Sequence, residues 1–147
     1  MWDEIGAVAT VVGVVVAAIG LWYAGRQLRE SRAIAKADFL LRLDSRFDQH
    51  NDVHLNLRGG KWTGDGGPET LPEWAAVEGY MGLFERVNVL RELGILDIGT
   101  IDKLYGYRVL NIDNNGKIHK VKLEPPLSKS WTDFIALRDA VKEYRRR

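Results

Sequence analysis

The stretch from Ile5 to Gly25 constrains this chain more than any other part of its sequence. Its twenty-one residues, IGAVATVVGVVVAAIGLWYAG, carry no charge. As an α-helix they would span about 31 Å, which matches the roughly 30 Å hydrocarbon core of a bilayer. A signal peptide is disfavoured because the preceding residues are acidic and the apolar run is too long. A buried core helix is rarely apolar on every face, so the stretch predicts a transmembrane helix.

The charges on either side of this stretch indicate its orientation. Asp3 and Glu4 precede it, whereas the residues that follow are mostly basic: Arg26, Arg29, Arg32 and Lys36. The positive-inside rule places the basic side in the cytoplasm. We therefore expect a protein of the inner (plasma) membrane, with its N-terminus outside and its C-terminal domain cytoplasmic. Contact with anionic lipid headgroups is expected from two groups of arginines: Arg26, Arg29 and Arg32, and Arg145, Arg146 and Arg147.

Small residues gather on one face of the predicted span. Glycine recurs every seven positions, and Ala17 falls near the same stripe, which gives the set Gly6, Gly13, Ala17 and Gly20. Helices in lipid associate mainly by close backbone approach, which small residues permit. We therefore expect a homo-oligomer that forms through this face. The alternative is that glycine and alanine are simply common in membrane helices.

The rest of the chain is long enough for one small domain. Its composition is mixed, and the net charge of the whole chain is +1, so no nucleic-acid partner is indicated. The sequence contains no cysteine, which excludes disulfides, thiolate zinc sites and cysteine nucleophiles. We expect a mainly α protein in two parts, a transmembrane anchor over 1–25 and a cytoplasmic helical domain over 26–147.

Helical patterns divide the cytoplasmic part into four helices and one long loop. Nothing stops the first helix after Gly25, so it is expected to run from about Asp3 to about Gln49, with 26–49 as a stalk. A loop is expected over 50–70, where glycine is frequent. Thr70 and Glu73 form a capping-box pattern at the start of the next helix. The three further helices are predicted at 71–94, 98–112 and 129–145, the last one capped by Ser128 or Ser130.

The segment from 109 to 123 allows two interpretations. Asn115-Gly116 is a typical hairpin turn, and a short β-ribbon could pair residues 110–112 with 118–120. The apolar spacing before the turn favours a helix followed by an extended arm, which we take as the first choice.

Three short motifs resemble those of a known family. They are a Gln-Leu-Arg-Glu stalk start at Gln27–Glu30, a Phe-Glu-Arg helix centre at Phe84–Arg86, and a Leu-Gly-Ile-Leu-Asp turn at Leu93–Asp97. With the N-terminal span, they resemble a family of small bacterial single-pass membrane proteins of unknown function with a helical cytoplasmic domain. The arm over 114–127 departs from that pattern. The resemblance implies an architecture and no catalytic residues.

One cluster has the composition of a metal site. Asp48, His50, Asp52 and His54 lie close together, and carboxylate and imidazole groups at such spacing can bind zinc. They are weak candidates, because polar loops often contain these residues. No nucleophile elbow and no phosphate-binding glycine motif occurs. We therefore expect no catalytic residues, no cofactor and no enzyme, and a metal-dependent enzyme is the last alternative.

Two functions follow from this organisation. The first is a membrane-anchored interaction or scaffold module that self-associates through its transmembrane helix. Its expected partners are the lipid bilayer, further copies of itself and an unidentified cytoplasmic protein. The alternative is an oligomeric membrane effector that perturbs lipid or conducts ions, for example in bacterial defence. Thr10 is the one polar side chain within the central part of the span, which argues against a wide aqueous pore.

Overall fold

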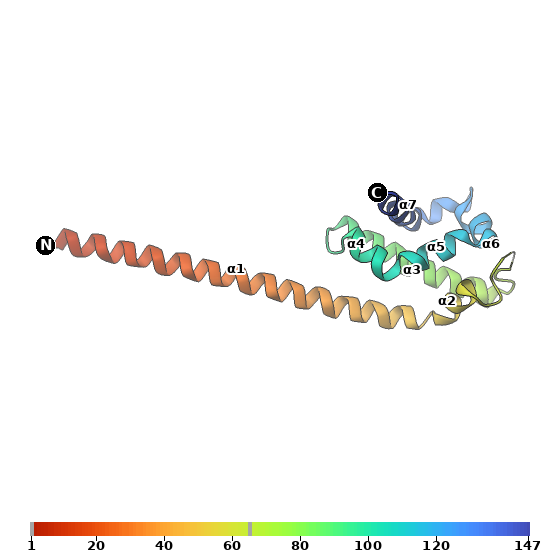
Figure 1. Ribbon diagram of the computed structural model, residues 1–147, viewed down its shortest axis with the longest axis horizontal. Coiled ribbons are helices and arrows are strands. Elements are labelled where there is room, and N and C mark those ends of the chain that lie inside the picture. The colour runs from red at the N-terminus through yellow and green to blue at the C-terminus, as the bar shows by residue number, and fades with distance from the viewer. Residues whose placement is uncertain (1, 65) are drawn as a thin grey trace. The chain divides into compact units, whose positions relative to one another are not determined.

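The computed structural model describes the backbone of residues 2–64 and 66–147, and the side chains of residues 19–31, 33–64 and 66–147 (Figure 1). Within these residues every element is helical and no strand occurs, which confirms the mainly α fold class. The chain forms two compact units, Met1–Arg42 and Leu43–Arg147, which are described separately here.

Helix α1 (Trp2–Asp48) is a single helix, as the absence of helix-breaking residues after Gly25 predicts. Its end lies one residue before the predicted one. In the first unit the described charged side chains form ion pairs along the helix surface, Arg26 with Glu30 at 3.0 Å and Arg42 with Asp38 at 2.9 Å. Large apolar side chains are exposed on the same unit: Ile19, Leu21, Trp22, Tyr23, Leu28, Ile34 and Leu41.

The predicted transmembrane span lies largely outside the part of the chain whose side chains are described. Those side chains begin at Ile19, so residues 5–18 of the span, including Gly6, Gly13 and Ala17 of the glycine stripe, are not among them. Within the described residues, no helix combines the length and the apolar character needed to traverse a bilayer. Gly20 is described, and a Cβ added to it would meet no atom within 4 Å.

The core of the second unit is built on aromatic side chains. Phe47, from the last turn of α1, contacts Phe84 with ring centroids 4.9 Å apart. Phe84 also contacts Tyr80 at 5.1 Å and Phe134 at 6.1 Å, both edge-on. Tyr80 and Phe84 belong to α3 (Leu71–Glu92), and Phe134 belongs to α7 (Thr132–Arg146). All four rings are at most 1% exposed, so these three helices share one apolar centre.

Helix α3 begins with the predicted capping box. The Thr70 hydroxyl accepts a hydrogen bond from the Glu73 backbone N–H at 3.4 Å, and the Glu73 carboxylate accepts one from the Thr70 N–H at 3.0 Å. The helix is followed by Gly94 with φ of +69°, a left-handed residue that suits glycine at a helix end. The predicted helix over 71–94 is therefore confirmed, with its C-terminus at Glu92.

The prediction of a loop over 50–70 is wrong in its first half. Residues Asn51–Arg58 form helix α2. Val53, His54 and Leu57 are buried on one face of α2, and this packing outweighs the low helix propensity of the polar residues around them. The described residues from 59 to 70 are irregular. Trp62 is buried within them, and its carbonyl accepts a hydrogen bond from Asn115 Nδ2 at 2.8 Å.

In residues 109–123 the helical part of the first interpretation is confirmed, whereas the extended arm and the alternative ribbon are both wrong. The predicted helix over 98–112 consists of α4 (Ile98–Ile101), the π-helical segment η1 (Asp102–Gly106) and α5 (Tyr107–Asn114). The predicted ribbon or arm is instead α6 (Gly116–Ile118) followed by a second π-helical segment, η2 (His119–Leu123). Asn115 explains the difference, because its Oδ1 accepts the Ile118 N–H at 2.9 Å and starts a helix where a hairpin turn was expected.

The last helix begins later than predicted. Leu127–Ser130 is a short 3-10 helix, η3, and α7 starts at Thr132 after Trp131, which provides no side-chain cap. The predicted serine cap is therefore wrong. The Glu85 carboxylate of α3 lies near the backbone N–H groups of Phe134 and Asp133, but burial and the Asp133 charge outweigh these groups and raise the pKa of Glu85.

Candidate functional site

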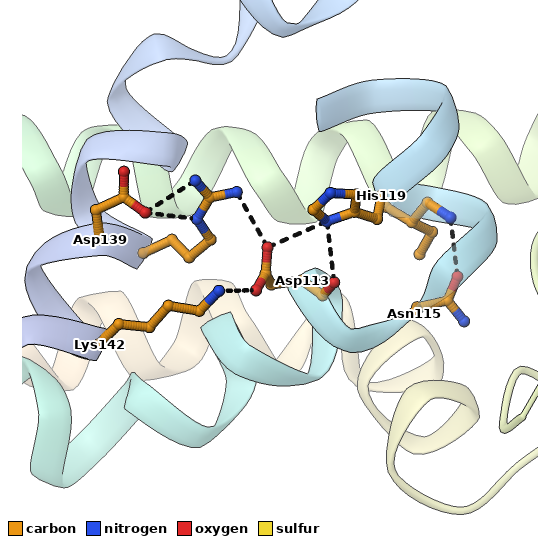
Figure 2. A network of polar contacts seen from close by, with 7 residues as sticks. Asp113, Asn115, His119, Asp139 and Lys142 are labelled. Atoms are coloured by element: carbon orange, nitrogen blue, oxygen red, sulfur yellow. Dashed lines mark hydrogen bonds and ion pairs between the residues drawn. The ribbon is translucent and has the colours of Figure 1, made fainter. Parts of the chain in front are cut away.

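Asp113, at the end of α5, is the centre of the network in Figure 2. Its side chain is 4% exposed and receives two cations from α7. Arg138 Nη1 lies 3.1 Å from Oδ1, and Lys142 Nζ lies 2.5 Å from Oδ2. His119 approaches from η2, with Nδ1 3.3 Å from Oδ1 and 3.2 Å from the Asp113 carbonyl oxygen. Asp113 therefore joins α5, η2 and α7.

The charges around Asp113 determine its protonation. Burial alone raises the pKa of this carboxyl, but the Lys142 hydrogen bond and the positive charges of Arg138 and Lys142 outweigh burial and hold the pKa below its usual value. An ionised carboxylate whose two oxygens are both occupied is a poor proton acceptor. The arrangement is that of an internal ion-pair network, and it favours a structural role over a catalytic one.

Arg108 is the centre of a second cluster, where α5 meets α2, α3 and the end of α1. Its Nε donates a hydrogen bond to the Tyr107 hydroxyl at 2.9 Å. Its guanidinium carbon lies 5.5 Å from the Phe47 ring centroid and 5.7 Å from that of Tyr107, as in cation–π contacts. Among the described residues, no carboxylate lies within ion-pair distance of Arg108.

Three buried polar atoms at or near Arg108 make no hydrogen bond of normal geometry within the described part of the chain, although the Tyr80 side chain interacts with the Arg108 guanidinium. They are Arg108 Nη1, the Tyr80 hydroxyl and His54 Nδ1. Tyr80 is 0% exposed and His54 is 5% exposed. Buried polar groups are paired in the great majority of cases, so three unpaired ones around one cation distinguish this cluster from the rest of the domain.

Burial and Arg108 together set the protonation of these groups. Burial raises the pKa of Tyr80 to about 12, although the nearby Arg108 charge lowers it somewhat. Burial, followed by the charges of Arg108 and Arg58, lowers the pKa of His54. At neutral pH the cluster therefore contains an intact phenol, a neutral imidazole and one guanidinium cation.

The carboxylate of Asp44, from the same region of α1, has a different partner. The Tyr105 hydroxyl donates a hydrogen bond to Asp44 Oδ1 at 2.6 Å. Burial and this bond raise the pKa of Tyr105. The Asp44 carboxylate therefore pairs with Tyr105, and none of the described carboxylates pairs with Arg108.

The side chains of the four residues in the predicted metal cluster lie in different surroundings. Asp48 and Asp52 are exposed, whereas the His50 ring packs near Tyr80 and the His54 ring lies edge-on to Tyr107 at 5.5 Å. Among the described residues, no three histidine or acidic side chains are grouped as a metal site requires. The structure thus gives no support to the metal interpretation of Asp48, His50, Asp52 and His54.

The arginines predicted to contact lipid differ in their surroundings. Arg26 pairs with Glu30, and Arg29 is exposed, while the side chain of Arg32 lies outside the described residues. At the C-terminus Arg145 pairs with Asp102 of η1 at 2.6 Å, so this residue belongs to the packed domain. Arg146 and Arg147 are more exposed, and both lie near Glu143.

Sequence reasoning did not identify Asp113, Tyr80 or Arg108 as members of polar clusters. A usable signal existed for Arg108. It falls one helical turn after Leu104 and one turn before Ile112, on an otherwise apolar face. Asp113 carried no such signal, because its partners Arg138 and Lys142 lie in another helix and look like ordinary surface charges.

The chain matches no model of a known protein family, and no curated protein or solved structure is similar to it at a significant level. Membership of the family that its motifs resemble therefore stays a prediction.

Proposed function

We propose that this protein is a membrane-anchored helical interaction or scaffold module that self-associates through its transmembrane helix. One observation carries the proposal. The uncharged stretch over 5–25 and the core residues Leu43 and Phe47 all belong to α1. The same helix therefore contains the proposed anchor and the first core residues of the second unit.

The exposed side chains of α1 support the same proposal. Leu21, Trp22 and Tyr23, near the C-terminal end of the uncharged stretch, are between 64% and 75% exposed. Aromatic side chains of this kind favour the membrane–water interface, and Arg26 and Arg29 follow them on the side expected to face the cytoplasm. The ion-pair network around Asp113 stabilises a packed domain, as an interaction module requires.

Membrane fractionation of the full-length protein tests the anchor. We expect the protein in the membrane pellet after alkaline carbonate washing, and in solution only after detergent is added. Val15→Arg places a charge at the centre of the span, which disfavours insertion by about 3 kcal/mol, and should reduce the membrane-bound fraction. Leu71→Arg is the matched control, because Leu71 is 86% exposed in the second unit. A wild-type protein that stays dispersed without detergent would overturn the anchor.

Self-association through the glycine stripe is tested by Gly13→Ile. The larger side chain would separate the helices, and we expect fewer oligomers in single-molecule counting in bilayers. Val11→Ile, on the opposite side of the same helix, adds one methylene and should leave the oligomer intact. Equal oligomer fractions for Gly13→Ile and the wild type would exclude this face.

Ion flux from liposomes separates the module from the membrane effector. A reconstituted oligomer that releases no trapped ions is the expected result. A leak that appears when a cellular ligand is added would replace the proposed module with the effector.

A further inference from the structure

We propose that His54, Tyr80 and Arg108 form a binding site for a small oxyanion that is free in solution, such as phosphate or the carboxylate of a small acid. The proposal is independent of membrane anchoring, because all three residues lie in the second unit. It depends on three features of the Arg108 cluster, which are its charge, its unpaired atoms and its solvent side.

The charge of the site is positive and has no internal counterion among the described residues. Arg108 is half-buried between the Phe47 and Tyr107 rings, and the Arg58 charge also acts on His54. Burying an unpaired cation is unfavourable, and an anion at this position would compensate for it.

The unpaired atoms of the site can all act as donors. Arg108 Nη1 and the Tyr80 hydroxyl carry hydrogens at neutral pH, and His54 Nδ1 donates in the tautomer that is protonated on this nitrogen. Charge-assisted hydrogen bonds from a guanidinium to an oxyanion are short and strong. A cation with two further donors matches phosphate or carboxylate, whose unprotonated oxygens accept hydrogen bonds, and it matches no metal ion.

Tyr107 forms the solvent side of the site. It is 40% exposed, its ring edge contacts His54, and its hydroxyl accepts the Arg108 Nε hydrogen bond. The three polar atoms are buried, so an oxyanion reaches them only after side chains at this surface move. This arrangement favours a small ion over a large ligand.

Thermal unfolding of the detergent-purified full-length protein tests the proposal, with inorganic phosphate as the probe and chloride at equal ionic strength as the reference. For the wild type we expect Tm to rise by about 4 °C once phosphate exceeds its Kd about tenfold. Tyr80→Phe and Arg108→Gln should lose most of this rise. Arg86→Gln is the matched control, because Arg86 is exposed on α3 and should leave the rise unchanged.

Tyr80→Phe keeps the test decisive if Arg108→Gln fails to fold. Removing an unpaired buried hydroxyl should leave Tm without phosphate equal to or above that of the wild type, so a lost response cannot be attributed to misfolding. An absent rise in the wild type, or an equal rise in all variants, would overturn the proposal. A rise that requires phospholipid in place of inorganic phosphate would also overturn it, since the ligand would then be a headgroup.

Discussion

Arg108 and Asp113 lie five positions apart along one run of helix, yet their charges are accommodated in different ways. Asp113 is buried with two cations and a histidine around it. Arg108 has aromatic rings and neutral donors around it and no carboxylate among the described residues. The first residue is satisfied within the domain, and the second is the stronger candidate for contact with something outside it.

Replacing Asp113 with asparagine tests the ion-pair network. Asp113→Asn leaves the charges of Arg138 and Lys142 without their partner, and we expect the free energy of unfolding at pH 7 to fall by about 3 kcal/mol. The matched control is Asp139→Asn, because Asp139 also pairs with Arg138 but is 59% exposed. Its effect should be below about 1 kcal/mol. Urea denaturation of both variants measures the difference, and equal losses would contradict the role assigned to Asp113.

The stabilisation provided by Asp113 should depend on pH. The pKa of Asp113 in the folded protein lies below its usual value of 3.8, so its stabilising effect is fully present above that pH and is lost as pH falls further. The advantage of the wild type over Asp113→Asn should therefore shrink when unfolding is measured in buffers below about pH 4. A constant difference from pH 7 to pH 3 would show that the carboxylate does not titrate as described.

Residue-level roles were the least predictable part of the candidate site. The spacing of His50 and His54 suggested a metal site. Spacing alone could not show that their rings pack near Tyr80 and Tyr107. Such contacts depend on how α2 sits on α3 and α5, which sequence periodicity does not encode.

At the scale of elements, two glycines of α3 have different surroundings. A Cβ added to Gly79 would lie 2.8 Å from His50 Cε1, whereas one added to Gly82 would meet nothing within 4 Å. Gly79 therefore permits the close approach of the chain between α1 and α2. Gly82 lowers helix propensity without a compensating contact in the described residues.

Alanine substitutions separate these two roles. Gly82→Ala should raise the free energy of unfolding by about 0.5–1 kcal/mol, because alanine restricts the unfolded chain and favours the helix. Gly79→Ala should lower it by about 1–2 kcal/mol, because the His50 ring must move. Urea denaturation measures both effects. Stabilisation by both substitutions would mean that the His50 contact is unimportant.

Local patterns predicted elements well when their signals acted within one segment. The capping box of Thr70 and Glu73 and the unbroken run of helix formers before Asp48 are of this kind. Helix α2 and the 116–123 segment were missed because tertiary burial of Val53, Leu57 and Ile118 decided the conformation there. Asn115-Gly116 does not form the hairpin turn that its sequence suggests. Asn115 instead caps a helix and donates hydrogen bonds to the Trp62 and Gly66 carbonyls.

At the scale of the whole molecule, the helical fold class was predictable, whereas the membrane topology stays a prediction. The chain contains no cysteine, so single cysteines can report topology without background. We expect a membrane-impermeant maleimide to label Asp3→Cys in intact cells and to label Ser130→Cys only after lysis. The reverse pattern would contradict the positive-inside assignment, and labelling at both positions before lysis would contradict a single span.

The two π-helical segments, over 102–106 and 119–123, each hold one residue more than an α-helix of the same length along its axis. Removing a single residue from 102–106 converts the wide turn into an α-turn and leaves the faces of the flanking helices α4 and α5 in phase. A chain shortened at exposed Leu104 should still fold, whereas the same deletion at buried Val87 would rotate everything downstream. Length variation in this domain is therefore expected to concentrate at the wide turn over 102–106.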